Sequence, residues 1–475
     1  MATAAPLGFL PPQLDGRVLA VSRWIVPLWL RWRSRITQVQ VEGIDHLLKA
    51  FVRFQAGESR LLLAFRHPSL DDPACMARLL WVDLAREARR RGVLLDPAPH
   101  GQFLFDRGIP LWAGKAMGWL FTHLGGSSIQ RGTLDLPALR TARQLLLEGP
   151  HPFALAPEGA TNGHNERISP LEPGTAQLAF WTAADLAAAG RPECMELLPI
   201  GLQYTFIDSV WRPLEDLLSR LEAGAGLSPD ASHDLAVAAL HGRLVRLGEC
   251  MLAQMEAFYR DRVHLPMPPL APDAEAQEDR ARFGARLQRL LDLALGRLEQ
   301  SFRLVPRGSL SDRCRRLEQA GWERLYPDSA DGPEAHSPLG RGLQERLAAE
   351  AEAQLWHMRV VESFLAVSGH YVAEHPSQER FADTLLLLWD TQCRIQGLSG
   401  NSRPRIGRRR VRIRIDRPIE VEGRLEDYRQ DRRRAVQALT DTLGERLERL
   451  IVPSPLDGAV LDGEPPPDVT PRPDA

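Results

Sequence analysis

The sequence predicts an α/β protein in which a mixed sheet is flanked by helices, with a large all-helical segment added to the chain. Through residues 39–207, short apolar runs suited to strands alternate with stretches whose apolar residues have helical spacing. From 208 to 405, long amphipathic helices follow one another between Pro-rich or Gly-rich breaks. Residues 408–423 then return to the period-two alternation of one half-buried strand.

The composition limits what the protein can do. The chain has 475 residues, of which 44% are hydrophobic and 25% charged, enough for a large core and more than one structural unit. Basic and acidic residues nearly balance, 59 against 61, so no overall charge attracts nucleic acid and we expect no such partner. The five cysteines are scattered and form no CxxC pair, which argues against disulfides and a zinc site. We therefore expect no bound metal and a reducing compartment.

Residues 1–38 are expected to form an amphipathic helix that associates with a membrane. Residues 17–36 combine three tryptophans and several aliphatic residues with five arginines and no acidic residue. Such a helix can lie in the headgroup plane, with its arginines near anionic lipid. The alternative is a surface helix that docks on the fold by its apolar face and is kinked at Pro27.

The sequence also predicts where the protein resides. No apolar run approaches the roughly 20 residues needed to cross a bilayer. The first residues lack the charged start and long apolar stretch of a secretory signal. We therefore expect a cytoplasmic protein that is peripheral on the inner face of a membrane.

The core, residues 39–207, should alternate strands with helices. We expect the helix after the second strand to begin at Pro73, because proline favours the first helical position. The glycine pair 125–126 should end another helix. The expected strands are 37–43, 59–65, 152–159 and 195–206, and the expected helices are 73–91, 111–124 and 173–190.

The remaining chain is predicted to be helical, with a late return to the core. The clearest amphipathic segments of the helical block are 233–262, 274–302 and 339–375. The strand at 408–423 and a last helix at 431–450 belong to a segment, 406–452, that completes the fold. Residues 453–475 are Pro-rich and acidic, and they should be disordered.

A histidine and an aspartate stand where the strand 59–65 leads into the next helix. His67 follows the strand, and Asp72 lies five residues on, at the helix start. A carboxylate there can hold the tautomer of an imidazole that accepts a proton. The alternative is structural, because Asp before an N1 proline is a common helix N-cap and a lone histidine is often a satisfied structural residue. Both roles are compatible, since a carboxylate has two oxygens.

Four short blocks follow one another along the core: RHPSLDDP (66–73), GGSSIQRG (125–132), APEGATNG (156–163) and LLPIG (197–201). In order and approximate spacing they resemble the four blocks of the glycerophospholipid acyltransferase family, whose members include 1-acylglycerol-3-phosphate acyltransferase. The first is similar to the family's His-x4-Asp motif, and the second to its Gly-Gly-x-x-Ile-x-Arg block. The third keeps Pro-Glu-Gly, and the fourth is an apolar strand with a proline.

The resemblance implies an acyltransferase-like core at 39–207 and an insertion at 208–405. It further implies an enzyme of phospholipid biosynthesis. Such an enzyme moves a fatty acyl group from a thioester of acyl carrier protein or coenzyme A to the hydroxyl of a glycerol-phosphate lipid. The expected acceptor is 1-acylglycerol-3-phosphate, and no cofactor is implied beyond the acyl thioester. Residues within 406–452 resemble the strand that closes the family's domain.

The same resemblance assigns roles to single residues. His67 would be the general base and Asp72 its orienting partner. Gly126 and Arg131 would approach the acceptor, Arg131 as a planar fork for phosphate. Glu158 and Gly159 would place backbone donors toward the reacting centre. The alternatives are a solvated loop arginine at position 131, and a buried ion pair or cap at position 158.

The third block departs from the family pattern, because Ala160, Thr161 and Asn162 stand where Thr-Arg-Ser is usual. The missing arginine removes one phosphate contact, which Arg66 or Arg167 would supply, or else the acceptor differs. Ser69 is not expected to be a nucleophile, since direct transfer needs no acyl-enzyme and no G-x-S-x-G elbow is present.

Two rival functions stay open. One is a catalytically inactive, membrane-associated binding or scaffold protein with the same fold, favoured by the altered third block and the large helical segment. The other is nucleic-acid binding through the arginine-rich residues 403–414. That segment lacks interleaved aromatic residues, so a solvated or lipid-facing strand is favoured over a nucleic-acid site.

Overall fold

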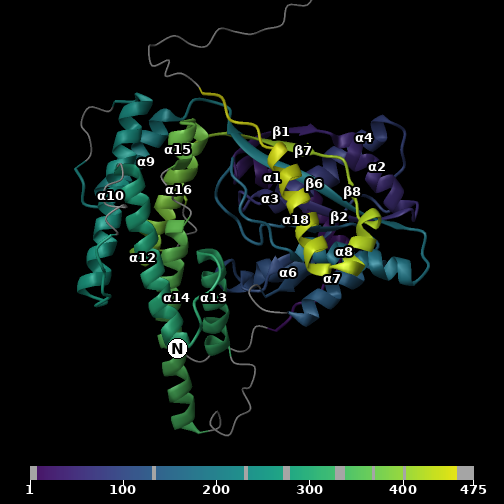
Figure 1. The fold of residues 1–475 in the computed structure, drawn as a ribbon. Coiled ribbons are helices and arrows are strands. Elements are labelled where there is room, and N and C mark those ends of the chain that lie inside the picture. Colours follow the sequence, from purple (N-terminus) through teal and green to yellow (C-terminus); the bar gives the residue numbers. More distant parts are fainter. Residues whose placement is uncertain are drawn as a thin grey trace, which may run out of the picture.

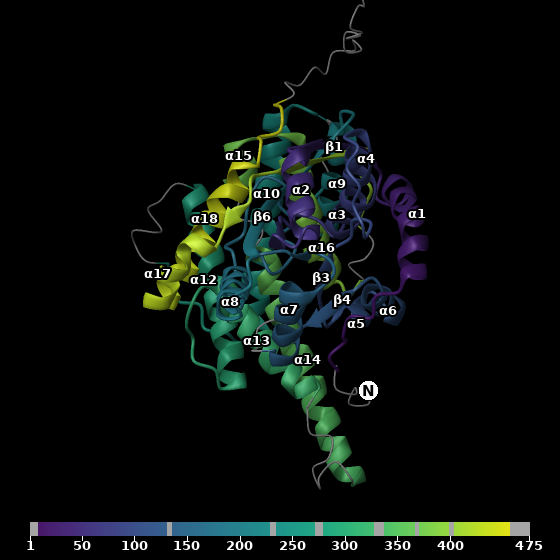
Figure 2. The same cartoon turned by 90° about the vertical axis from the view of Figure 1, so that its right-hand side faces the viewer.

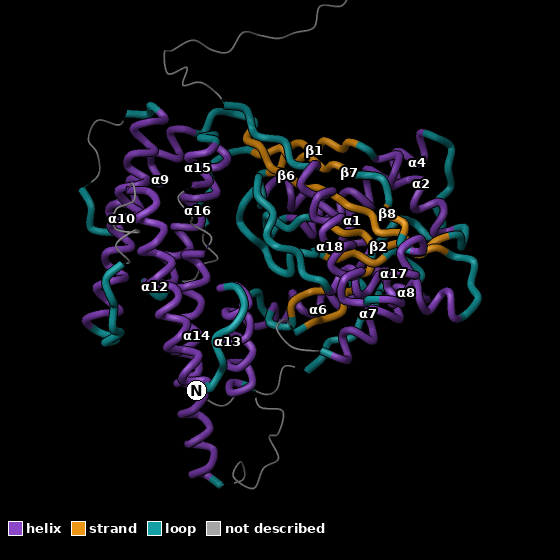
Figure 3. The backbone as a smooth tube through the Cα atoms, in the orientation of Figure 1, coloured by secondary structure: helices purple, strands orange, loops and turns teal. Residues whose placement is uncertain are grey.

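A computed structural model describes residues 8–130, 135–228, 234–270, 279–326, 337–365, 370–398 and 403–456. In these ranges the protein is an α/β structure, with a mixed eight-stranded sheet flanked by helices, as the sequence predicts. A second body made of long helices stands beside the sheet (Figures 1 and 3).

The sheet has the strand order β1-β7-β6-β2-β5-β3-β4, and β8 pairs with β6 outside this path. The strands from β6 to β4 run parallel to one another, whereas β7 and β8 are antiparallel to β6, and β1 is parallel to β7. Parallel strands end at one edge of a sheet, so the loops after β2, β5 and β6 gather there. The strands are β1 (Ile36–Glu42), β2 (Ser59–Phe65), β3 (Gln102–Asp106), β4 (Gly126–Ile129), β5 (Phe153–Leu155), β6 (Cys194–Phe206), β7 (Arg409–Ile415) and β8 (Ile419–Glu420).

Helices cover both faces of the sheet, which explains why β2 reads as an unbroken apolar run. Alternate residues of β2 enter two different cores, with Leu61 and Leu63 on one face and Leu62 on the other. The first face carries α1 (Gly16–Trp32), α2 (Ile44–Gln55), α3 (Asp72–Arg78), the π-helical turn η1 (Leu79–Leu84) and α4 (Ala85–Arg90). The second carries α7 (Leu136–Glu148), α8 (Gly174–Ala188), η3 (Glu422–Arg424), α17 (Leu425–Gln430) and α18 (Arg432–Arg449). Two short helices, α5 (Ile109–Trp112) and α6 (Lys115–His123), connect β3 to β4.

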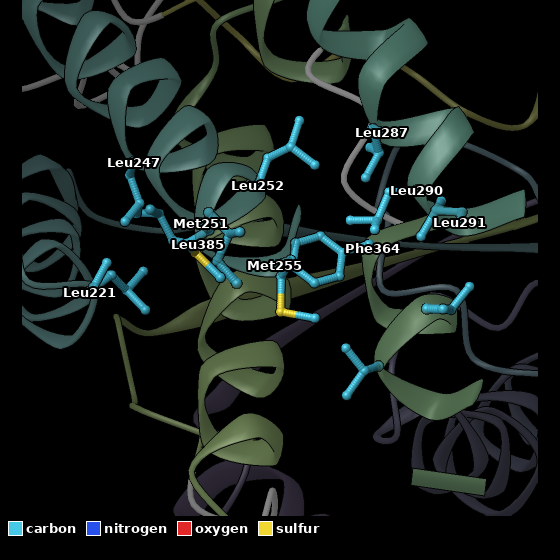
Figure 4. Packing of buried hydrophobic residues seen from close by; sticks show 14 of the residues in the cluster. Leu221, Leu247, Met251, Leu252, Met255, Leu287, Leu290, Leu291, Phe364 and Leu385 are labelled. Carbon is cyan, nitrogen blue, oxygen red and sulfur yellow. The ribbon is translucent and has the colours of Figure 1, made fainter. Parts of the chain in front are cut away.

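The helical body has a hydrophobic core of its own (Figure 4). In α10 the buried residues Leu240, Leu244, Leu247 and Met251 recur every three or four residues, so they form one apolar stripe. The body consists of α9 (Trp211–Gly224), α10 (Val237–Asp261), α12 (Asp279–Phe302), α13 (Leu310–Leu325), α14 (Pro338–Leu365), α15 (His370–Glu374) and α16 (Gln378–Ile395). One end of α14 extends beyond the rest of the body (Figure 2).

The chain leaves the sheet for the helical body and returns to it at one place. Phe206 ends β6, Arg409 begins β7, and these two residues face each other in the antiparallel β6–β7 ladder. The sheet is therefore continuous from β6 to β7. The helical body is connected to it through the end of β6 and the start of β7.

Several predicted boundaries need correction. The segment 408–423 forms two strands instead of one, because Pro418, which lacks an N–H group, lies between β7 and β8. The segment 111–124 forms two helices separated at Gly114, whose φ is 89°. The strands β3 and β4 and the helices α2 and α7 were not predicted.

The predicted disordered tail also starts too early. Ser454 is only 3% exposed, and its backbone N–H donates to Glu166 (2.8 Å). The rest of that tail, from residue 457, lies outside the described residues. None of the helices in the described ranges is both long and apolar enough to cross a membrane.

Candidate active site

Residues that follow or end three neighbouring strands meet at the carboxyl edge of the sheet. His67 follows the end of β2, Glu158 follows the end of β5, and Tyr204 lies near the end of β6. Since β2 pairs with both β5 and β6, the sheet itself brings these three residues together.

His67 and Asp72 form a hydrogen-bonded pair. His67 Nδ1 lies 2.9 Å from Asp72 Oδ2. The Asp72 side chain is fully buried, whereas 19% of the His67 side chain is exposed. Asp72 Oδ2 also accepts from Ser69 N (2.8 Å), and its other oxygen accepts from the Tyr204 hydroxyl. A carboxylate that accepts from Nδ1–H leaves a lone pair on Nε2, which faces away from Asp72.

The capping alternative for Asp72 does not describe this geometry. Asp72 is the first residue of α3, and the N-cap residue before it, Asp71, makes no side-chain cap hydrogen bond. The donors to Asp72 come instead from the turn 67–69 and from β6. The aspartate therefore orients the imidazole and organises the turn that leads into the helix.

Tyr204 stabilises the Asp72 carboxylate of the His67–Asp72 pair by a hydrogen bond. Burial raises the pKa of its phenol well above the ordinary value, so the hydroxyl stays protonated and keeps donating to Asp72. The guanidinium of Arg409 lies over the Tyr204 ring, 5.2 Å from its centroid, and pairs with Asp71. The start of β7 thus closes the site on one side.

Glu158 is buried, and both of its carboxylate oxygens accept hydrogen bonds from other residues of the protein. It is 1% exposed, and Oε1 accepts from the backbone N–H of His67 (2.9 Å). Its Oε2 accepts from the Asn162 side chain (2.6 Å) and from Ser169 N (2.9 Å). Glu158 therefore joins the first and third sequence blocks as a positioning residue, through hydrogen bonds to backbone N–H groups and an amide.

Gly159 is required by the turn that follows Glu158. Its φ is 72°, and a Cβ at this position would lie 2.0 Å from the Glu172 carboxylate. Its backbone N–H donates to Ala156 O (3.1 Å) instead of pointing at a reacting centre. The role in the structure is conformational.

Thr161 contacts the other nitrogen of His67. Its Oγ1 lies 2.9 Å from His67 Nε2, and both side chains are only partly buried. The neighbouring Asn162 is fixed, because its backbone N–H donates to His67 O (3.2 Å) and its amide donates to Glu158 and to Arg167 O. Nothing in the sequence indicates this contact beyond the departure of the third block from the family pattern.

Arg66 is not available for a phosphate. It is completely buried, and its guanidinium donates to the backbone carbonyls of Asn165 (2.9 Å), Leu202 (3.3 Å), His164 (3.3 Å) and Arg167 (2.8 Å). Burial lowers its pKa from the ordinary arginine value. Arg66 therefore anchors the loop after β5, which corrects the suggestion that it replaces the missing arginine. Arg167, the other residue suggested, is exposed.

Gly126, from the second block, does not lie beside the dyad. Gly126 begins β4, so it lies at the opposite end of that strand from the edge that carries His67. A Cβ on Gly126 would lie 2.7 Å from the Phe103 ring and 2.8 Å from Phe121 O, so the glycine is needed for packing. Arg131 lies outside the described residues. The strand that precedes it is three strands from β2, or about 14 Å at the usual spacing.

The helical body holds the loop that follows β5. From α16, Asp383 accepts from Asn165 N (2.8 Å), and Arg380 pairs with Glu166 (2.9 Å). The Tyr371 hydroxyl of α15 accepts from Glu166 N (2.9 Å) and donates to Asp383 (2.9 Å). The loop that carries Thr161 is therefore fixed from the sheet by Arg66 and from the helical body by α15 and α16.

No group of three or more His, Cys, Asp or Glu side chains that could hold a metal ion occurs within the ranges described above. Comparisons of the chain with protein-family models, with curated proteins and with solved structures find no match. The functional argument therefore depends on the site itself.

Proposed function

We propose that the protein is an acyltransferase that moves a fatty acyl group from a thioester of acyl carrier protein or coenzyme A to the hydroxyl of a glycerol-phosphate lipid. The observation that carries the proposal is the buried Asp72 carboxylate on Nδ1 of a partly exposed His67. This arrangement leaves Nε2 as a base at the carboxyl edge of an α/β sheet, where such proteins bind their substrates.

His67 Nε2 takes the proton of the attacking hydroxyl as the new ester bond forms, and it returns a proton to the departing thiolate. The imidazolium that exists between these events is stabilised by Asp72, which keeps its other oxygen on Tyr204. The protein supplies the base, and the thioester supplies the activated acyl group.

The first, third and fourth sequence blocks support this reaction class. The first and third blocks share the hydrogen bond from His67 N to Glu158, and the fourth block lies in β6, directly beside β2. In this proposal residues 39–207 and 406–452 form the acyltransferase core, and 208–405 are an insertion in a β6–β7 connection. The preferred acceptor is 1-acylglycerol-3-phosphate.

A membrane surface is the second part of the proposal, and α1 supports it. Its buried residues Leu19, Ser22 and Leu30 face the fold. A separate face exposes large apolar side chains over the length of the helix, namely Val21 (57%), Trp24 (81%), Ile25 (53%), Leu28 (59%) and Trp32 (76%). A docked surface helix needs only one apolar face, so the second one is suited to a lipid surface.

Helices next to α1, and the turn of the candidate site, expose further apolar residues. Trp119 of α6 (54%) and Leu111 of α5 (51%) belong to helices beside α1 (Figure 2). Leu70 (62%) lies in the turn between His67 and Asp72. The end of α1 is tied to that turn, because Ser34 Oγ donates to Asp71 (2.6 Å). A lipid-bound α1 would thus hold the site close to the headgroups, on the inner face of a membrane.

The test uses the purified full chain with long-chain acyl coenzyme A or acyl carrier protein and 1-acylglycerol-3-phosphate in vesicles, with the lipid product measured. His67→Ala is expected to lower the rate by about 10²–10⁴-fold, because the base is lost. His46→Ala is the matched control, since His46 also lies beside an aspartate, Asp45, but at the start of α2.

Transfer by His67→Ala at the wild-type rate would refute the assignment of the base. If no thioester supports transfer while the protein still binds vesicles, the rival function, a membrane-associated binding or scaffold protein, replaces the enzymatic one.

A further inference from the structure

Three basic side chains gather between α1 and the amino ends of β3 and β5. Arg23 belongs to α1, His100 lies two residues before β3, and His151 lies two residues before β5. The two imidazole rings meet edge to face, with centroids 5.1 Å apart. Arg23 Nη2 donates to the carbonyl oxygen of Pro99, the residue before His100 (3.3 Å). This cluster lies at the opposite edge of the sheet from His67, because β2, β3 and β5 run parallel.

Arg23 stands on the face of α1 that packs against the fold. It lies four residues after Leu19 and seven before Leu30, both of which are buried, so the three side chains share one face. Arg23 Nε is buried without a hydrogen-bond partner, and the guanidinium forms no ion pair with any residue that the structure describes. Burial lowers the pKa of Arg23 from the ordinary arginine value. A cation withdrawn from water costs free energy unless an anion compensates it, which indicates a ligand at this position.

The two histidines of the cluster differ in how their rings are used. Trp81 Nε1–H donates to His100 Nδ1 (3.1 Å), so His100 Nε2 carries the hydrogen and donates to Leu124 O (2.9 Å). Burial lowers the pKa of His100 to about 4, and the ring stays neutral. The His151 ring is also buried, but it makes no hydrogen bond within the described part of the chain. Two donors of the cluster, Arg23 Nε–H and the N–H of His151, therefore have no acceptor among the described residues.

We infer that Arg23 and His151 bind one phosphate-type oxyanion, supplied by a lipid headgroup or by free phosphate. A tetrahedral oxyanion has several oxygens, so it can accept from a planar guanidinium and from an imidazole N–H together. Arg23 is only partly buried, so an anion can reach it from the surface. Its neighbour Trp24 is 81% exposed on the apolar face of α1 that suits a lipid surface. The ring of His100 holds His151 in place without competing for the anion.

The first experiment measures the binding of inorganic phosphate to the full chain by titration calorimetry, at an ionic strength kept constant with chloride. We expect saturable binding and a melting temperature that rises with phosphate. Arg23→Gln removes the charge and the planar fork, so its phosphate affinity should fall about tenfold or more. His151→Phe keeps the ring contact with His100 but removes the N–H, so its affinity should fall as well.

Arg17→Gln is the matched control, because Arg17 lies on the same helix but is exposed. It should bind phosphate like the wild type. Without phosphate, Arg23→Gln should melt at or above the wild-type temperature, since the variant no longer holds an uncompensated cation. A loss of affinity then reflects the site and not the fold. If the wild type does not bind phosphate, or if Arg23→Gln and His151→Phe bind it as tightly as the wild type, the site is refuted.

The second experiment distinguishes a lipid headgroup from free phosphate as the source of the anion. Sedimentation with phosphatidylcholine vesicles that contain phosphatidate compares Arg23→Gln with Arg17→Gln, which remove the same charge from α1. A headgroup ligand predicts vesicle binding about tenfold weaker for Arg23→Gln than for Arg17→Gln. Equal vesicle binding, with the loss of phosphate affinity confined to Arg23→Gln, assigns the site to free phosphate. Neither measurement involves acyl transfer, so the outcome is independent of the proposed enzymatic function.

Discussion

At the scale of single residues, the site depends on the hydrogen bonds that the Asp72 carboxylate accepts. Its carboxylate accepts from an imidazole, a backbone N–H and a phenol, and it has no contact with solvent. A buried carboxylate is stable only when such donors compensate for lost hydration. The same contacts that stabilise Asp72 therefore fix the orientation and tautomer of His67.

Tyr204 gives a direct test of this support. Tyr204→Phe removes one donor from the buried Asp72 carboxylate, so we expect the free energy of unfolding to fall by about 1–3 kcal/mol. We also expect a rate about tenfold lower, equivalent to about 1.4 kcal/mol of transition-state stabilisation. Denaturant unfolding and the transfer assay measure the two effects.

Tyr259→Phe is the matched control. Tyr259 is also buried and its hydroxyl bonds to His357 (3.1 Å), but it belongs to the core of the helical body. The Tyr259→Phe variant should be less stable than the wild type but should transfer the acyl group at the same rate. An equal loss of activity in both variants would show that Tyr204 acts only through global stability.

Site residues that lie close together in the sequence could be predicted, whereas those brought together from distant parts of the chain could not. His67 and Asp72 are five residues apart, so a strand end and a helix start bring them together with little help from the rest of the fold. Thr161 and Tyr204 meet them only because β5 and β6 flank β2, which no local pattern reveals. Arg66 looked available in the sequence, but it is buried among backbone carbonyls contributed by a distant loop.

At the scale of elements, the loop after β5 joins the two bodies of the protein. It receives Arg66 from β2 on one side, and Arg380 and Asp383 from α16 on the other. The helical body is therefore more than an appendage, because the element that carries Thr161 is held by it.

Asp383 makes this junction sensitive to pH. Burial raises the pKa of its carboxyl from 3.8 to about 7. Between these values the folded protein keeps a proton that the unfolded chain releases. The stability that Asp383 contributes is thus complete below about pH 4 and is lost as the pH rises through about 7. The asparagine variant, which stays neutral, still offers an oxygen to Asn165 N and Tyr371. We expect Asp383→Asn to be roughly 1–3 kcal/mol more stable than the wild type at about pH 8, and equal to it at about pH 4.

Unfolding curves at both pH values check this expectation. Asp390→Asn, on the same helix, is the control, because Asp390 pairs with Arg403 near the surface and its loss should change stability by about 1 kcal/mol or less. A gain for Asp383→Asn that is the same at both pH values would rule out titration of this carboxyl as the cause.

Elements were predictable where one pattern dominates. The buried strand β2 and the helix α8 match their predicted ranges closely, because an apolar run or a helical period is unbroken there. The five-residue strand β3 has no such pattern, because only three apolar residues lie between its polar ends Gln102 and Asp106. A single proline, Pro418, separates β7 from β8. The alternating pattern of the segment continues past this proline, so the break was not predicted.

At the scale of the whole molecule, the exposed apolar surface is unevenly distributed. The large apolar side chains of α1 form one face beside α5 and α6, and the turn that holds Leu70 adjoins it. The arginines of 403–414 are largely paired with side chains of the protein itself, with Arg403 on Asp390, Arg409 on Asp71 and Arg414 on Glu42. Lipid contact through α1 thus has more support than an anionic partner at β7.

The triple variant Trp24→Ser, Leu28→Ser and Trp32→Ser tests the membrane face. Each buried apolar side chain contributes about 1.5–3 kcal/mol on transfer from water, so we expect partitioning into anionic vesicles to fall by about 10²-fold or more. The fold should persist, because α1 packs through Leu19 and Leu30. Vesicle sedimentation measures the change.

The control replaces three equally exposed leucines of α14, Leu339 (75%), Leu343 (60%) and Leu347 (54%), by serine. These variants should bind vesicles like the wild type. Equal losses in the two triple variants would show that general surface hydrophobicity, and not α1, drives the binding.

The late return of the chain to the sheet affects how the protein is made. The strand β1 is synthesised early, yet its neighbour β7 leaves the ribosome only after the whole helical body has emerged. Until then β1 has no strand partner and β6 has an open edge, and an open strand edge can recruit strands of other nascent chains. We therefore expect folding at the ribosome to finish with the arrival of β7, and chaperones that shield strand edges to matter most while the helices are being synthesised.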